Sequence, residues 1–316
     1  MTDQERYLFD LQGYLVVPDA LTAGQVASLN VLLDERIAGE MAPEETTRRW
    51  FLDLLSWGQP FVDLLDNPRV EPYLAEVLGD GFRADHLYVD VIRRGLSPIG
   101  ATLHGGGTPF DRVNFYDFRN GRMYSGLFVV AYNLADVGPE DGGFACVPGS
   151  HKSNYPFPAE WRDLTDRQPF VERITGPAGT AVLFTEALTH GPLPWSGAHE
   201  RRTLFYKYHH RGGAWSHNYP VADGLTVTER QRRILQPPSK HYRDARRTTR
   251  PCQASSTAPC QRVALPVKIA PSRFPLGGVG LTIPEAIDTV ANDCVGGYDA
   301  VTESGGELGR GAGPIL

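Results

Sequence analysis

Two histidines and one arginine are the residues of this sequence whose spacing could support metal chemistry. His104 follows the segment Ala-Thr-Leu, and His190 comes shortly after the apolar run 181–184. Arg201 lies 11 residues beyond His190. Each histidine ends a segment typical of a β-strand and directly precedes a glycine, and a β-barrel can direct two such imidazoles at one ion. We therefore expect His104 and His190 to bind a shared metal.

Arg201 indicates which kind of cosubstrate could bind beside the metal. A mononuclear iron site for oxygen chemistry uses two histidines and a carboxylate and leaves positions open for O2 and a cosubstrate. When 2-oxoglutarate is the cosubstrate, its keto and C1 carboxylate oxygens chelate the iron, and its far carboxylate needs a buried cation. Arginine suits this role because its planar fork pairs with a carboxylate through two hydrogen bonds. Neighbours on a strand face opposite ways, so of Arg201 and Arg202 only one can point inward, and the offset from His190 favours Arg201.

Helices are expected mainly before residue 80. A short helix from residue 5 runs into a strand at 14–17. Thr22 and Gln25 have the spacing of a capping box, and apolar residues follow at helical intervals. Further helical segments are predicted at 50–65 and 70–78, and another at 228–235 near the end of the patterned sequence.

From residue 87 onward, short β-branched and aromatic segments alternate with turn residues. Strands are predicted at 87–92, 125–134, 143–147, 171–174, 180–184 and 203–209. No βαβ alternation and no Gly-x-Gly-x-x-Gly motif is present, which disfavours a Rossmann fold. The expected fold is mainly β with N-terminal helices, built as a double-stranded β-helix, the jelly-roll or cupin-like barrel.

These segments resemble the phytanoyl-CoA dioxygenase family of Fe(II)- and 2-oxoglutarate-dependent oxygenases. The matching parts are the strand 128–134, the element Gly-Gly-Phe-Ala-Cys-Val-Pro-Gly-Ser-His at 142–151, and the series Phe184, His190 and Arg201. The resemblance covers roughly residues 5–240. It implies the double-stranded β-helix, bound Fe(II), 2-oxoglutarate and O2 as cosubstrates, and succinate and CO2 as products. It also makes His151 part of a turn that shapes the barrel mouth, rather than a third histidine ligand.

One residue departs from the family pattern, which places an acid two residues after the first histidine. Here that position is Gly106. In one hypothesis the position is vacant and chloride binds iron there, as in the halogenases of this superfamily. In a second, another carboxylate substitutes: Glu186, four residues before His190 in an apolar strand, or with less support Asp111. In a third, water fills the position or catalysis is lost. A glycine that simply permits a turn with positive φ is the plainest explanation.

The leading hypothesis is a dioxygenase that hydroxylates an unactivated C–H bond of a small, polar metabolite. Arg93, Arg94 and a polar, aromatic loop after His104 would suit an anionic or polar substrate. The alternatives are a halogenase with chloride beside Gly106 and, from a different class, a jelly-roll binding protein without catalysis. Their cofactors would be Fe(II) with 2-oxoglutarate and O2, with chloride added in the halogenase.

The composition limits the partners and the cellular location that we expect for this protein. The chain has 316 residues and a formal net charge of −6, which argues against a general nucleic-acid binder. No apolar segment approaches a membrane span, no signal peptide is recognised, and the four cysteines have no Cys-x-x-Cys spacing. We expect a cytoplasmic protein that acts on a small molecule. Its oxygenase domain should span residues 1–240, helical over 1–80 with a jelly-roll core at about 85–215. The segment 241–316 should be disordered or irregular.

Overall fold

The computed structural model describes residues 1–51, 53–165, 168–216 and 223–239. All of them belong to one compact unit, Met1–Pro251. The predicted irregular segment 241–316 lies outside the described residues. No helix among the described residues is long and apolar enough to cross a membrane.

The elements follow the expected order, with helices first and strands after them. The helices are α1 (Asp3–Gln12), α2 (Ala23–Glu40), α3 (Gln59–Val62), α4 (Glu71–Leu78) and α5 (Glu229–Ile234). The strands are β1 (Tyr14–Val17), β2 (Thr47–Phe51), β3 (Arg83–Ile92), β4 (Tyr116–Arg119), β5 (Arg122–Ser125), β6 (Phe128–Asn133), β7 (Gly143–Cys146), β8 (Glu172–Arg173), β9 (Ala181–Thr185), β10 (His190–Leu193) and β11 (Arg201–His209). Short 3-10 turns occupy Leu54–Ser56, Asp63–Asp66, Ser150–Lys152 and Ala159–Trp161.

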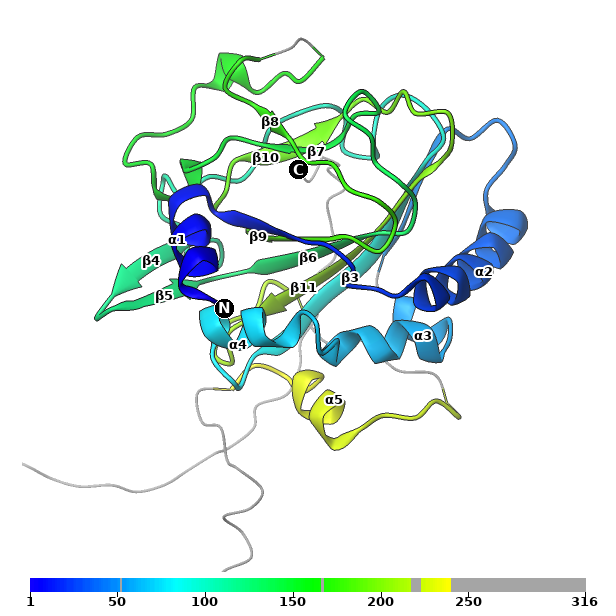
Figure 1. Ribbon diagram of the computed structural model, residues 1–316, viewed down its shortest axis with the longest axis horizontal. Coiled ribbons are helices and arrows are strands. Elements are labelled where there is room, and N and C mark those ends of the chain that lie inside the picture. Colours follow the sequence, from blue (N-terminus) through cyan, green and yellow to red (C-terminus); the bar gives the residue numbers. More distant parts are fainter. Residues whose placement is uncertain (52, 166–167, 217–222, 240–316) are drawn as a thin grey trace, which may run out of the picture. The chain divides into compact units, whose positions relative to one another are not determined.

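The strands form a large sheet, a small sheet and a hairpin. The large sheet has six antiparallel strands in the order β1-β9-β6-β11-β3-β2, and the small sheet has the order β10-β7-β8. Strands β4 and β5 pair separately. Figure 1 shows the small sheet on one side of the large sheet and helices α2 to α5 on the other.

Two apolar cores match these layers, because successive strand residues face opposite sides of a sheet. On β11, Leu204, Tyr206 and Tyr208 pack toward the helices. Phe205, on the same strand, packs with Phe144 of β7 in the core between the two sheets. This arrangement confirms the predicted jelly-roll class, although the two sheets are not joined into one closed barrel within the described residues.

The helical predictions hold except in one segment. The capping box at Thr22 and Gln25 is present, and Leu29, Leu33 and Ile37 of α2 are buried. The helical zone predicted over 50–65 begins later than expected and is broken into short pieces. Trp50 pairs with Val89 in β2, and short helical segments follow at Leu54–Ser56 and from Gln59 onward. Trp50 and Phe51 complete the edge of the large sheet, so tertiary pairing decides their conformation.

The predicted strand 125–134 is also divided in the structure. Ser125 ends the β4–β5 hairpin, and β6 begins at Phe128. Asn120 and Gly121 have φ values of 54° and 74° at the hairpin turn. An Asn-Gly pair between strands is a strong signal for such a turn, so the hairpin could have been predicted where the sequence analysis expected a loop.

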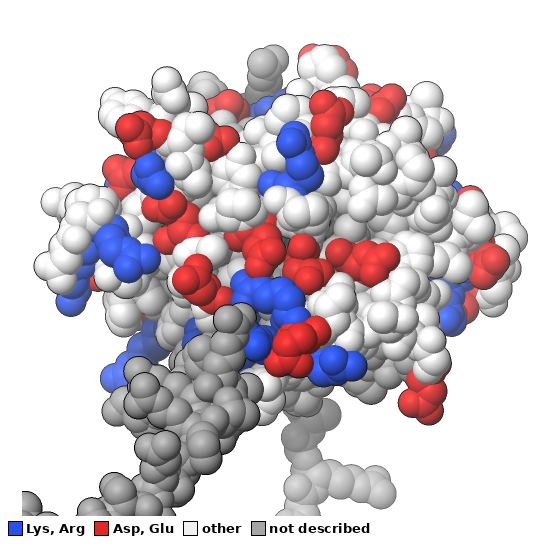
Figure 2. Space-filling model, turned by 60° about the horizontal axis from the view of Figure 1, so that its bottom comes forward, with Lys and Arg blue, Asp and Glu red and all other residues white. Residues whose placement is uncertain are grey.

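The surface carries mixed charge. On the face in Figure 2, acidic and basic side chains lie next to one another. Two of the ion pairs formed by α5 illustrate this mixture: Arg230 with Glu71, and Arg233 with Glu229.

Candidate metal centre

His104 and His190 meet between the two sheets. They exchange backbone hydrogen bonds, His104 N to His190 O at 2.8 Å and His190 N to His104 O at 2.9 Å. Their rings lie 4.2 Å apart between centroids. The loop after His104 fits tightly here, since a Cβ at Gly105 (φ +75°) would stand 2.6 Å from the carbonyl oxygen of Leu188. Glycine at 105 therefore allows the two histidine segments to approach each other.

Backbone carbonyls orient both imidazoles. Nδ1 of His190 lies 2.7 Å from Leu188 O, and Nδ1 of His104 lies 3.4 Å from Thr102 O. A carbonyl only accepts, so Nδ1 carries the proton and Nε2 keeps its lone pair. Burial lowers the pKa of both rings, and with the added effect of His104 the pKa of His190 falls to about 3. Both rings are thus neutral at physiological pH, the form in which histidine binds a metal.

Glu186 completes a cluster with these histidines. One ligand atom from each of His104, Glu186 and His190 lies within 4.8 Å of the others, and no other such group of three or more occurs among the described residues. Oε2 of Glu186 lies 3.8 Å from Nε2 of His190. The sequence analysis reached Glu186 from a wrong premise. It assumed a continuous strand, but β9 ends at Thr185 and a turn carries residues 186–189.

Lys207 forms an ion pair with Glu186. Its Nζ donates to Oε1 of Glu186, and both side chains are almost fully buried. Burial is the largest single effect and would raise the pKa of Glu186, but Lys207 and the rings of His190 and His104 together lower that pKa below its usual value. The carboxylate is therefore ionised in the interior, as a metal ligand must be.

Arg201 lines the same cavity as both histidines. Phenylalanines 144, 184 and 205 form apolar walls of this cavity, and Tyr88 and Ser97 also contact it. Arg201 is buried, and its Nε has no hydrogen-bond partner within the described part of the chain. Near it, Arg49 donates two hydrogen bonds of 2.7 Å to Asp90 and stacks over Tyr88. With Arg49 neutralised by Asp90, Arg201 is, among the described residues that line this cavity, the cation available to an anion.

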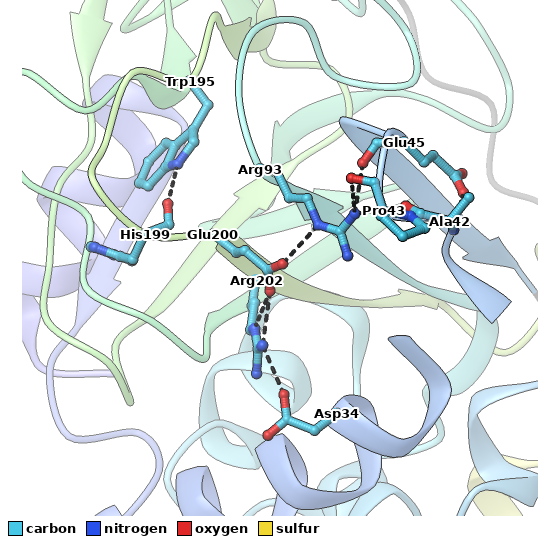
Figure 3. Close-up of polar contacts among 9 residues, drawn as sticks. All are labelled: Asp34, Ala42, Pro43, Glu45, Arg93, Trp195, His199, Glu200 and Arg202. Carbon is cyan, nitrogen blue, oxygen red and sulfur yellow. Dashed lines mark hydrogen bonds and ion pairs between the residues drawn. The ribbon is translucent and has the colours of Figure 1, made fainter. Parts of the chain in front are cut away.

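Arg202 belongs to a different network. It pairs with Glu200 and Asp34, and Glu200 also accepts from Arg93 (Figure 3). Nη1 of Arg93 donates to the backbone carbonyls of residues 42, 43 and 45. Arg202 and Arg93 thus tie β11 and the end of β3 to the helical layer. Neither lines the cavity that holds the two histidines, where the sequence analysis had considered Arg202 for the cosubstrate and Arg93 for a substrate.

Comparison with known proteins agrees with this geometry. The family described as Phytanoyl-CoA dioxygenase (PhyH) matches residues 73–203. Residues 73–203 form a phytanoyl-CoA dioxygenase domain. Similar solved structures include HygX from Streptomyces hygroscopicus with nickel and 2-oxoglutarate bound, at 25% identity and a TM-score of 0.60 over 68% of this chain and 89% of that one.

Further structures of HygX extend the comparison. The iron-bound form has 25% identity and a TM-score of 0.58, and the alignment covers 68% of this chain and 88% of that one. A form with nickel, 2-oxoglutarate and hygromycin B has 24% identity and a TM-score of 0.58, over 68% and 89% of the two chains. No curated protein sequence matches. Family and fold together make this chain a 2-oxoglutarate-dependent oxygenase.

Within the phytanoyl-CoA dioxygenase domain, Gly106 has a backbone reason to be glycine. Its φ is +111°, a conformation that other residues adopt only with strain, and an added Cβ would lie 3.3 Å from Thr189 Oγ1. Asp111 is exposed and caps its own loop, accepting from Val113 N and Asn114 Nδ2. It is not brought to the histidines.

His151 and Trp195 make packing and hydrogen-bond contacts that support the fold. His151 is buried against Tyr116, with its Nε2 3.1 Å from Asp10 O, so it too lies outside the metal cluster. Trp195, five residues after His190, packs with Ile92 and Val137 and donates to His199 O (Figure 3).

Lys207, which pairs with Glu186 beside the histidines, was not singled out by the sequence analysis. Arg201 was correctly expected on an inward-facing strand position, and residues 203, 205 and 207 follow it at intervals of two. The alternation along β11 therefore carried the signal that a lysine would reach the interior. A buried lysine then requires a carboxylate partner.

Proposed function

We propose that His104, His190 and Glu186 hold Fe(II) and that Arg201 binds the far carboxylate of 2-oxoglutarate. In this proposal the chain hydroxylates an unactivated C–H bond of a small, polar metabolite and releases succinate and CO2. The observation that carries the proposal is the buried cluster of two histidines and one carboxylate beside a cavity lined by an arginine with an unpartnered Nε.

The donor set fits iron. Two neutral imidazoles and one carboxylate, with one ligand atom of each within 4.8 Å of the others, match the two-histidine, one-carboxylate set typical of oxygen-activating iron. Bound iron would supply the oxidation of 2-oxoglutarate and of the substrate C–H bond by O2. The protein contributes orientation and the apolar walls of the cavity.

The residues that line the cavity suit the chemistry of the cosubstrate. 2-Oxoglutarate carries two carboxylates, and Arg201 offers one of them a desolvated, charge-assisted pair, which is stronger than the same pair in water. The apolar walls formed by Phe144, Phe184 and Phe205 exclude water around it. Ser97 supplies a hydroxyl at the same cavity.

The halogenase alternative loses its main support. It required an iron shell without a protein carboxylate, whereas Glu186 offers one and the glycine at 106 follows from its φ of +111°. Hydroxylation is the outcome that this donor set favours.

The test is succinate formation from 2-oxoglutarate by the full chain with Fe(II) and O2. We expect the wild-type protein to form succinate and a metal chelator to stop it. His190→Ala should lower the rate at least ~100-fold, because the remaining residues hold the metal weakly. The exposed His199→Asn serves as the matched control and should retain the wild-type rate. Unchanged turnover in His190→Ala would refute the proposed site.

A further inference from the structure

Glu186 uses its two carboxylate oxygens differently. Oε1 accepts from Lys207, while Oε2 faces His190 Nε2 at 3.8 Å. The backbone holds this arrangement, since Glu186 N donates to Leu127 O just before β6, and Lys207 pairs with Val129 on the same strand. The turn after β9 and the inner face of β11 are thus fixed to one another through β6.

Lys207 stands at an irregularity in the sheet. Along the β3–β11 ladder, Tyr206 pairs with Leu87 but Tyr208 pairs with Ala84, so that Asp85 and His86 together lie opposite Lys207. Such bulges redirect side chains and are common next to active sites. On β3, Asp85 binds His86 and Arg83. On β11, Lys207 extends over Tyr88 toward Glu186.

We propose that Lys207 is a positioning residue that keeps one oxygen of Glu186 away from the metal. The inference rests on the proposed function of the cluster. A carboxylate without this partner can bind a metal through both oxygens and so occupies one more coordination position. With Oε1 held by Lys207, Glu186 supplies a single oxygen, which leaves room for the two oxygens of 2-oxoglutarate and for O2.

The proposal makes an unusual prediction for Lys207→Met, which keeps the length of the side chain but removes the donor and the charge. With Co2+ as the probe, metal affinity should stay the same or increase, because Glu186 gains a second oxygen for binding. The Kd for 2-oxoglutarate on the Co2+-loaded protein should rise ~10-fold, as expected for losing one well-made polar interaction. Lys207→Arg, which retains donor and charge, should stay within ~3-fold of wild type.

Two controls separate positioning from general damage. Tyr206→Phe removes a buried hydrogen bond to Phe61 O on the opposite face of the same strand, so it should lower Tm without changing the Kd for 2-oxoglutarate. Lys207→Met in a Glu186→Gln background, at saturating Co2+, should have no further effect on that Kd if Lys207 acts through Glu186. A loss of the same size in both backgrounds would mean that only its charge attracts 2-oxoglutarate, and would overturn the proposal.

The remaining outcomes distinguish this inference from the function it rests on. If Glu186→Gln binds Co2+ as tightly as wild type, Glu186 is not a ligand, and the proposed site and this inference both fail. If Glu186→Gln weakens Co2+ but Lys207→Met leaves the Kd for 2-oxoglutarate unchanged, the site stands and the role of Lys207 is refuted. Weaker Co2+ binding in Lys207→Met, at a pH where Glu186 is ionised without Lys207, would also refute it, because a freed and ionised oxygen adds a ligand for the metal.

Discussion

Arg201 and Arg202 are neighbours in the sequence but face different parts of the structure. Arg201 faces the core between the sheets with an unpartnered Nε, whereas Arg202 binds Glu200 and Asp34 at the helical layer. The strand alternation separates them. Residue type alone would have treated them as equivalent.

Arg201→Ala should therefore weaken 2-oxoglutarate use selectively. Loss of a desolvated, charge-assisted pair costs about 1.5–3 kcal/mol, which corresponds to a KM for 2-oxoglutarate raised ~10–100-fold. Steady-state kinetics at varied 2-oxoglutarate measures this. Arg202→Ala is the matched control and should change the KM less than ~3-fold. Equal effects of the two substitutions would show that the anchor has been misassigned.

At the scale of elements, two segments distant in the sequence make the site. The loop after His104 and the turn 186–189 before β10 approach within backbone contact at Gly105, where a Cβ would lie 2.6 Å from Leu188 O and 2.7 Å from Glu186 O. The precision of the metal cluster depends on this contact, because it sets the separation of His104 from Glu186 and His190.

Gly105→Ala should for this reason be far more costly than an ordinary glycine substitution. The added methyl group meets backbone that cannot move without disturbing the cluster, in addition to the strain of φ +75°. We expect a loss of about 3 kcal/mol in the free energy of unfolding, measured by denaturant titration. Gly121→Ala, at the turn of the β4–β5 hairpin, has φ +74° but no atom of the described residues within 4 Å of the new Cβ, so it should lose only about 1 kcal/mol. A similar loss at both positions would contradict the role given to the contact.

Sequence patterns predicted the elements better than their pairing. The capping box of α2 and the alternation of β11 are local, and both appear as expected. Trp50 and Phe51 were placed in a helical segment because their position at the edge of the large sheet depends on β3, about 40 residues later. The proximity of Glu186 to His190 depends on a turn, and a strand pattern could not indicate its geometry. Lys207 was missed because its partner lies on another element.

At the scale of the whole molecule, buried histidines make stability depend on pH. Burial lowers the pKa of His151 and of His209 to about 4. Because these folded-state pKa values lie below the unfolded value near 6.5, both histidines favour the folded state above pH 6.5. That stability decreases as the pH falls from about 6.5 toward 4, since the unfolded chain then binds protons that the folded protein does not.

The metal-free protein should therefore lose stability between pH 7 and pH 5. Each of these histidines accounts for a loss of the order of 1–2 kcal/mol over this range. Denaturant titrations at the two pH values measure the difference. His151→Asn should reduce it, while His199→Asn, at an exposed position, should not. A free energy of unfolding that stays constant between pH 7 and pH 5 would contradict this account.

The central claim is that Glu186, and not a residue near Gly106, completes the iron site. The most direct measurement is an anaerobic titration of the metal-free protein with Fe(II) and 2-oxoglutarate, following the visible charge-transfer band with and without chloride. We predict a band that does not respond to chloride in the wild type and in Asp111→Ala. For Glu186→Ala we predict at least ~10-fold more Fe(II) to reach the same band. A band that shifts with chloride, and that forms equally well in Glu186→Ala, would contradict the claim and make the halogenase hypothesis the better one.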